Sequence, residues 1–186
     1  MRKFSHQIRE SLFVTTPKGF RICEEAISSL KLPRPSFGIN YNTFDHDWLM
    51  IKIRRALEKS GEARVWFSER VLLANPDLLD GFSQDYFPDG VYEAPDGTLI
   101  AVELEISRKV RSLYREKLNR YVKYMRETNG SKTAIKSVTI LVAKTAVRKV
   151  IEDEARIFGD YFRILPLGEF LAQHQPQLKK EKSHET

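Results

Sequence analysis

Cysteine and histidine are both scarce in this chain of 186 residues, which has one cysteine, Cys23, and four histidines. A single cysteine excludes a disulfide within the chain and any metal site built on several thiolates. The histidines stand at positions 6, 46, 174 and 184, too far apart in sequence to indicate a cluster of imidazole ligands. No apolar run approaches the roughly 18 residues of a membrane span, and the first residues lack the apolar core of a secretory signal. We therefore expect a cytoplasmic protein.

The composition is that of a globular domain with a basic surface. Hydrophobic residues make up 41% and charged residues 30% of the chain, which is long enough for one domain with a sizeable core. The net charge is +6 and the isoelectric point about 9.4. A basic surface attracts polyanions, of which nucleic acid is the commonest in a cytoplasm. On charge alone, a basic protein with no nucleic-acid role is an equal alternative.

The first 35 residues look separate from the rest. The run SLFVTT is strand-like, a helix follows from Pro17, and LPRPSFG reads as a linker. The strand–TPKG–helix pattern resembles the wing and last helix of a winged-helix DNA-binding domain. The alternative is an N-terminal arm that packs on the main domain, which we place at residues 36–175. The polar tail, residues 176–186, is expected to be disordered.

The elements after residue 42 alternate in a regular order. Helices are expected at 42–61, 108–130, 145–159 and 168–175, and strands begin near 63, 85, 98, 136 and 160. Three consecutive strands can form a meander, and a strand reached through a helical crossover can add in parallel. The order predicts an α/β fold, with a mixed central sheet flanked by helices and a core order of α-β-β-β-α-β.

Three acidic residues carry the chemistry that this fold would support. Asp89 opens the second strand, and Glu103 and Glu105 lie two apart on the third strand, so they share one face. If these strands pair about the APDG turn, Asp89 lies near the same point. Three such acids repel unless a cation lies among them, and carboxylates hold the magnesium ions that assist phosphodiester hydrolysis. An edge strand with a solvated acidic face is the alternative.

The motifs PDG, ELE and SRK together resemble the signature of the PD-(D/E)XK nucleases, over residues 43 to about 145. More narrowly, DHDWLMIKIRRAL, WFSER, FPDG…VELEISRK and YREKLNRYVKYM resemble the replication-relaxation family, which includes the MobC-type relaxases of mobilisable plasmids. A winged helix ahead of a nuclease-like domain is similar to that family's layout. The resemblance implies a restriction endonuclease-like core.

The resemblance also implies roles for individual residues. Asp89 and Glu103 would ligate Mg²⁺ or Mn²⁺, helped by the backbone carbonyl of Leu104. The position that usually holds lysine is Glu105 here, so Glu105 would act as a third ligand or as general base. Lys109 is then the candidate for stabilising the developing phosphorane charge, and a solvated lysine at a helix start is its equal alternative.

Two further positions precede the strand acids. In this family a His-Asp pair such as His46 and Asp47 looks like a recurrent element that reaches the metal site or orients a ligand. Helix capping is slightly favoured for Asp47, while the role of His46 stays open. Glu69 is a possible further acid, although a surface residue after a strand is the favoured interpretation.

The long helix at 108–130 combines tyrosines with basic residues. Many relaxases cut DNA with a tyrosine nucleophile beside three clustered histidines, but no such cluster is visible in this sequence. The basic side chains that can run along DNA phosphates are Arg111, Arg115, Lys117, Arg120 and Lys123. The alternative is a set of half-buried tyrosines, at 114, 121 and 124, beside a solvated basic face.

The sequence therefore predicts a metal-dependent DNA endonuclease or nickase, which resembles a plasmid mobilisation relaxase that nicks the transfer origin to start conjugation. Its partners would be DNA, an accessory DNA-binding protein and a type IV coupling protein. The main alternative is a catalytically weak DNA-binding accessory of plasmid transfer or replication, favoured by the missing lysine after Glu103. A third possibility is an RNA-processing or repair nuclease of the same fold.

Overall fold

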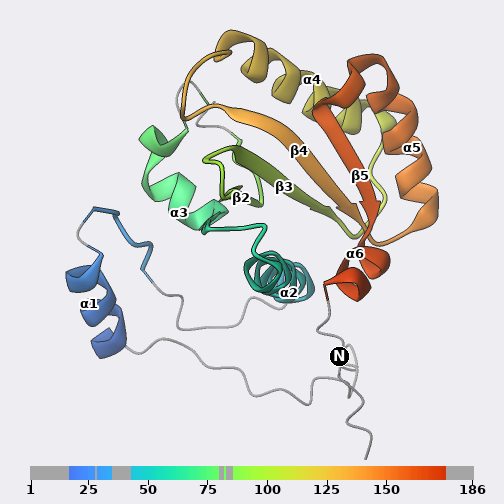
Figure 1. Cartoon of the computed structure of the whole chain (residues 1–186). Helices are drawn as coiled ribbons and strands as arrows, with labels where there is room; N and C mark the ends of the chain where they lie inside the picture. The colour runs from blue at the N-terminus through green and yellow to red at the C-terminus, as the bar shows by residue number, and fades with distance from the viewer. Residues whose placement is uncertain (1–16, 28, 35–42, 80–81, 83–85, 175–186) are drawn as a thin grey trace, which may run out of the picture.

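A five-stranded sheet forms the centre of the molecule (Figure 1). The computed structural model describes residues 17–27, 29–34, 43–79, 82 and 86–174. The strands follow one another across the sheet in chain order: β1 (Val65–Ser68), β2 (Gly90–Glu93), β3 (Leu99–Glu105), β4 (Ile135–Val142) and β5 (Phe162–Pro166). The first three strands are antiparallel, whereas β4 and β5 add in parallel. This confirms the predicted mixed sheet.

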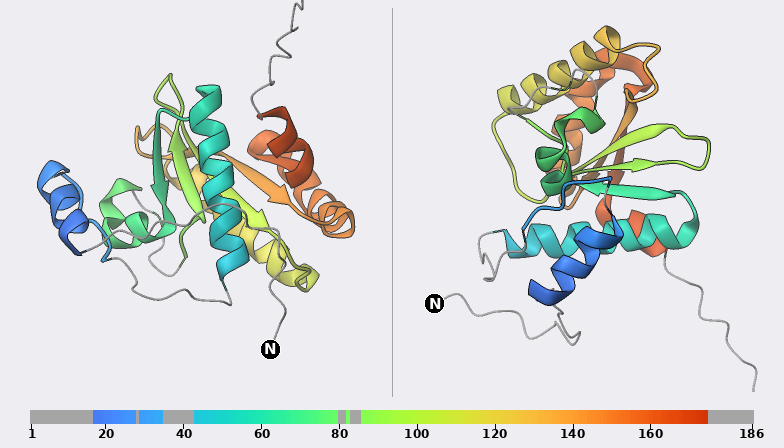
Figure 2. Two further views of the ribbon diagram at one scale, coloured as in Figure 1. Left: turned by 90° about the horizontal axis from the view of Figure 1, so that it is seen from below. Right: turned by 90° about the vertical axis from the view of Figure 1, so that its left-hand side faces the viewer.

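Helices cover both faces of the sheet (Figures 1 and 2). On one side lie α4 (Arg111–Glu127) and α5 (Thr145–Ala155), and on the other lie α2 (Phe44–Ser60) and α6 (Leu167–Gln173). The two faces alternate along β3, as the period of a strand requires. Leu99 and Ala101 pack in the core with α4 and α5, and Val102 and Leu104 pack in the core with α2 and α6.

The connections explain the strand directions. β2 and β3 form a hairpin closed by a β-turn in which the Gly97 amide donates to the Ala94 carbonyl at 2.9 Å. Gly97 has a φ of 84°, a backbone conformation that favours glycine, and Pro95 supplies the fixed φ of the second turn position. In contrast, α4 carries the chain from β3 to β4 and α5 carries it from β4 to β5, so each of these pairs is parallel.

Shorter elements complete the core and refine the sequence prediction. The helix α3 (Glu69–Ala74) and the 3₁₀ turn η1 (Pro76–Leu78) separate β1 from β2, where the sequence analysis predicted no helix. A second 3₁₀ segment, η2 (Arg156–Tyr161), joins α5 to β5. The second strand begins at Gly90 rather than near 85, and the preceding Pro88 has no amide hydrogen for a strand ladder.

The residues described before position 43 contain α1 (Pro17–Ala26), which ends earlier than the helix expected there. Asn75 holds this part of the chain to the main fold, because its side-chain amide pairs with the backbone of Lys31 through two hydrogen bonds of 2.8 Å. The expected strand at 11–16, most of the linker and the tail at 176–186 lie outside the described residues. None of the helices in the described part of the chain is long and apolar enough to cross a membrane.

Candidate active site

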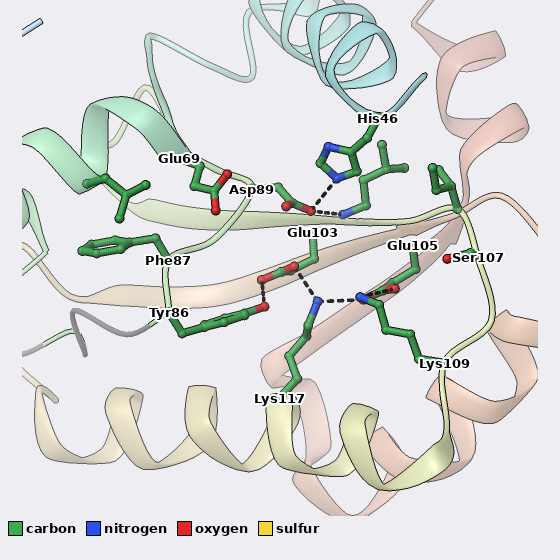
Figure 3. Close-up of a pocket in the computed structure, with 13 residues that line it drawn as sticks. His46, Glu69, Tyr86, Phe87, Asp89, Glu103, Glu105, Ser107, Lys109 and Lys117 are labelled. Atoms are coloured by element: carbon green, nitrogen blue, oxygen red, sulfur yellow. Dashed lines mark hydrogen bonds and ion pairs between the residues drawn. The ribbon is translucent and has the colours of Figure 1, made fainter. Parts of the chain in front are cut away.

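The three predicted acids meet at one cavity of about 380 Å³ (Figure 3). In the β2–β3 ladder, Gly90 pairs with Val102, so one step further Asp89 stands opposite Glu103. Glu103 and Glu105 continue the face of β3 that packs against α4, and each is only 1% exposed. The hairpin geometry that the sequence analysis assumed is therefore present, and it brings Asp89, Glu103 and Glu105 together.

Asp89 is held by two hydrogen-bond donors. The Leu104 amide donates to Asp89 Oδ2 at 2.7 Å, and His46 Nε2 lies 3.3 Å from the same oxygen. Burial would raise the pKa of Asp89, but His46 and the Leu104 amide outweigh it, so the pKa is lowered. The hydrogen bond to Asp89 in turn raises the pKa of His46. His46, whose role the sequence left open, therefore reaches the acidic site from the start of α2.

Glu103 is surrounded by donors from three side chains. The Tyr86 hydroxyl donates to Glu103 Oε1 at 2.6 Å, the Tyr121 hydroxyl donates to the same oxygen, and Lys117 Nζ lies 2.7 Å from Oε2. Burial raises the pKa of Glu103 despite the opposing effect of Lys117. Nothing in the sequence motifs pointed to Tyr86, which lies in the segment before β2 that also contains Asp89.

Lys117 occupies the position between the two strand glutamates. Its Nζ lies 2.7 Å from Glu103 Oε2 and 2.7 Å from Glu105 Oε1, and its side chain is 14% exposed. The charges of the glutamates raise the pKa of Lys117, although burial alone would lower it. Lys117 is thus a charged lysine inside the cavity.

Lys117 is largely buried, whereas the sequence alone grouped it with the basic residues of this helix that can run along DNA phosphates. A helix brings residues three and four apart onto one side. Lys117 falls between Tyr114 and Tyr121 at that spacing, and both tyrosines are buried. A lysine within the apolar stripe of the helix was the sequence signal that it points inward.

Lys109 lies beside Glu105, as expected for a residue of the site. Its Nζ is 3.0 Å from Glu105 Oε2, and its side chain is 42% exposed. Its backbone amide donates to the Tyr114 hydroxyl at 2.9 Å. This hydrogen bond joins the segment before α4 to the helix. Glu105 therefore faces two ammonium groups, those of Lys109 and Lys117.

The other basic residues of α4 are mostly engaged within the protein. Arg111 and Arg115 both pair with Glu154 of α5. The Arg120 guanidinium lies 4.6 Å from the centre of the Tyr86 ring and pairs with Glu116. Lys123 is 75% exposed, with Glu127 at 3.9 Å, so it remains the most open of the predicted phosphate contacts.

Of the remaining candidates, Glu69 lines the cavity and Asp47 does not. Glu69, at the start of α3, lines the cavity, and burial followed by the charge of Asp89 raises its pKa. Asp47 lies within the first turn of α2, while Thr43 takes the N-cap position. The Thr43 hydroxyl donates to Asp47 Oδ2 at 3.2 Å, so Asp47 supports the cap residue instead of being it.

The oxygen ligands of the site match the kind that Mg²⁺ and Mn²⁺ bind. Asp89 and Glu103 are the residues best placed to hold such an ion, because they stand opposite each other and the charge of Asp89 adds to the rise in the pKa of Glu103. Across the described ranges, no group of three or more histidine, cysteine, aspartate or glutamate side chains has the arrangement of a metal site. Lysine ammonium groups instead lie against Glu103 and Glu105.

Comparison with known proteins adds no relative. No protein-family model matches this sequence, and no curated protein matches it at a significant level.

Proposed function

We propose that the chain is a metal-dependent nuclease that cuts DNA, as an endonuclease or nickase, at the cavity formed by Asp89, Glu103 and Glu105. The observation that carries the proposal is the meeting of two opposed carboxylates, Asp89 and Glu103, with a buried lysine, Lys117. Converging carboxylates can hold a catalytic metal ion, and a fixed cation beside them can stabilise the charge that develops in phosphodiester hydrolysis. The basic surface supports a polyanionic substrate.

In this proposal Asp89 and Glu103 hold Mg²⁺ or Mn²⁺. The ion would neutralise charge on the phosphate and activate the attacking water. Tyr86 and Tyr121 fix the Glu103 carboxylate in orientation through their hydrogen bonds. His46 and the Leu104 amide do the same for Asp89.

The lysines supply the positive charge that the ELE motif lacks. Lys117 lies between the glutamates and Lys109 lies at the open side of the cavity, so both can approach a phosphate bound there. A fixed ammonium group stabilises the charge that develops on a phosphoryl oxygen in the transition state. Glu105, which faces both lysines, is the candidate to accept the proton of the attacking water.

The tyrosines favour hydrolysis over a covalent protein–DNA intermediate. The hydroxyls of Tyr86 and Tyr121 already donate to Glu103, and burial raises the pKa of both phenols. Tyr114 and Tyr124 are buried and hydrogen-bonded to backbone atoms. A tyrosine nucleophile needs an accessible, readily ionised hydroxyl.

The test is cleavage of supercoiled plasmid, with and without a transfer origin, in Mg²⁺, Mn²⁺ or EDTA. The wild type is compared with Glu103→Gln, which keeps the size of the buried side chain and removes its charge. Cleavage that needs both the metal and Glu103 is the expected result. The absence of cleavage by a folded wild-type protein in both metals would count against the proposal, and a protein–DNA adduct resistant to denaturation would count against hydrolysis.

The narrower proposal is nicking at a plasmid transfer origin, in the manner of the MobC-type relaxases that the sequence resembles. It would involve the coupling and accessory proteins of plasmid transfer. Faster cutting of the origin plasmid than of a matched plasmid without the origin is the expected result. Equal cutting of both plasmids would contradict the narrower proposal and support a DNA nuclease without preference for the origin.

A DNA-binding accessory protein is the second candidate, and the ion pairs of Lys117 favour it. Glu103 and Glu105 are compensated by an internal cation, which lets the fold persist without a metal. DNA binding that is the same in EDTA and in Mn²⁺, and that survives Glu103→Gln, would support this candidate. Calorimetric detection of metal binding that is lost in Asp89→Asn would support the enzyme.

A further inference from the structure

A second cavity, of about 310 Å³, opens directly beside the candidate active site. The two cavities share three lining residues, His46, Glu69 and Asp89. A strand of nucleic acid whose phosphate lies at Asp89 can therefore continue into this second space. The lining of the second cavity decides which part of that strand it would accept.

One part of the lining of the second cavity is apolar. It is formed by Met50 and Ile51 of α2 and by Trp66 of β1, with Ile51 46% exposed. The indole of Trp66 lies so close to Gly90 that a Cβ added there would meet its ring at 2.2 Å. The Trp66 ring therefore packs against the backbone of Gly90, the residue that follows Asp89. A fixed aromatic ring beside aliphatic side chains is suited to a planar, apolar partner.

The charged side chains of the second cavity are of both signs, because Asp47, Glu69 and Asp89 line it together with two arginines. Arg54 of α2 and Arg70 of α3 both line it. The Arg54 side chain is 52% exposed and pairs with Glu58 on its own helix, whereas Arg70 is exposed on the surface. Guanidinium groups bind phosphate oxygens in pairs of hydrogen bonds. The cavity therefore combines an apolar wall for a base with two arginines for a phosphate.

We propose that the second cavity holds one unpaired nucleotide, the neighbour of the phosphate bound at Asp89. Its base lies against Trp66 and Met50, and its phosphate lies at Arg54 and Arg70. The base is unpaired because a base within a duplex is stacked on both sides and cannot reach an apolar wall. This proposal rests on the proposed nuclease function and specifies its substrate as single-stranded or frayed DNA.

The two tryptophans of the chain provide the first test, because each can serve as the control for the other. Trp48→Phe leaves Trp66 in the cavity as the reporter, and Trp66→Phe leaves Trp48, which does not line the cavity. An oligothymidine of eight nucleotides in EDTA is expected to quench Trp66 and to leave Trp48 nearly unchanged. The duplex of equal length should quench Trp66 less. Equal quenching of both reporters, or stronger quenching by the duplex, would overturn the proposal.

The second test measures how the affinity for the same oligonucleotide depends on salt. Arg70→Ala is expected to lower the slope of log affinity against log salt by about 1. The matched control is Lys132→Ala, an exposed lysine at another cavity of the molecule, and it should leave the affinity nearly unchanged. Equal slopes for Arg70→Ala and the wild type would overturn the phosphate contact.

The outcomes separate this proposal from the proposed function. If the wild type cuts plasmid but Trp66 and Arg70 do not respond to single-stranded DNA, only the second cavity has been misassigned. If the wild type neither cuts nor binds DNA, both proposals fall together.

Discussion

Lys117 and the two strand glutamates form a charge cluster in which each group is buried against another. One ammonium group bridges Glu103 and Glu105 at 2.7 Å on either side. Removing one member of a buried ion pair leaves its partner as an uncompensated buried charge. The resulting loss of stability is larger than the net stabilisation that the intact pair contributes. The stability of the protein and its affinity for a cation are therefore coupled at this residue.

Lys117→Met tests that coupling. The substitution keeps a long side chain but removes the charge, so we expect the free energy of unfolding to fall by about 3–5 kcal/mol. Mn²⁺ should recover more stability in Lys117→Met than in the wild type, because an ion bound only by the folded state stabilises it. Urea denaturation with and without Mn²⁺ measures both effects.

Lys117→Arg is the control for this prediction, since it retains the positive charge. We expect it to lose less stability than Lys117→Met and to show a smaller response to Mn²⁺. An equal loss in both variants, with no response to Mn²⁺, would show that packing rather than charge is at stake.

At the scale of elements, α4 is joined to α5 by a charged contact on the outer side of the sheet. Glu154 of α5 accepts hydrogen bonds from both Arg111 and Arg115. The hydrogen bond from Arg115 has the larger effect and that from Arg111 the next. Together they lower the pKa of Glu154 from 4.5 to about 2. A carboxyl whose pKa is depressed by folding stabilises the folded state above its unfolded pKa.

Glu154→Gln should therefore reduce stability in a way that depends on pH. The contribution of Glu154 is complete above about pH 4.5 and is lost as the pH falls toward 2, where the carboxyl becomes protonated. Thermal unfolding of the wild type and Glu154→Gln should differ at pH 6, and the difference should shrink toward zero near pH 2. A difference that is constant over this range would contradict the prediction.

The start of β2 depends on the absence of a side chain at Gly90. A Cβ at this position would meet the Trp66 ring at 2.2 Å, so the ring would have to move. We expect Gly90→Ala to cost about 1–3 kcal/mol of stability, as overpacking of a core does. Urea denaturation measures the cost, and the near-ultraviolet circular dichroism of Trp66 reports the displaced ring.

Gly168→Ala is the matched control for Gly90→Ala. Gly168 lies in α6 with no atom within 4 Å of an added Cβ, so this change should be neutral or stabilising by up to about 1 kcal/mol. If Gly90→Ala behaved in the same way, Trp66 would have room to move without cost.

For the molecule taken together, a net charge of +6 would attract the DNA substrate that we propose. The basic residues of α4 do not contribute equally to contact, because several are occupied within the protein. Arg115 is held by Glu154, whereas Lys123 is 75% exposed. Only an open side chain can exchange its counterions for a DNA phosphate.

Lys123→Ala should lower the salt slope of DNA binding by about 1 while leaving the stability almost unchanged. Arg115→Ala should do the opposite, losing stability at neutral pH with little change in the slope. Fluorescence anisotropy over a range of salt concentrations, combined with thermal unfolding, separates the two. A larger change of slope for Arg115→Ala than for Lys123→Ala would mean that DNA displaces Glu154.

Local sequence patterns were enough to predict the order of the strands and longer helices, the mixed sheet and the three carboxylates of the candidate site, but not α3 or η1. These features depend on local patterns: the alternation along β3, the helical stripes of α2 and α4, and the glycine of the β2–β3 turn. The spacing of Glu103 and Glu105 fixed their common face, and the length of the hairpin placed Asp89 opposite Glu103.

The side chains that surround the three acids depend on tertiary packing. Lys117 comes from α4, His46 from α2 and Tyr86 from the segment before β2, and α4 and α2 pack on opposite faces of the sheet. The helical pattern places Lys117 on the buried side, but it does not say which strand that side faces. The contact of Trp66 with Gly90, and with it the second cavity, exists because β1 pairs with β2 in one particular register.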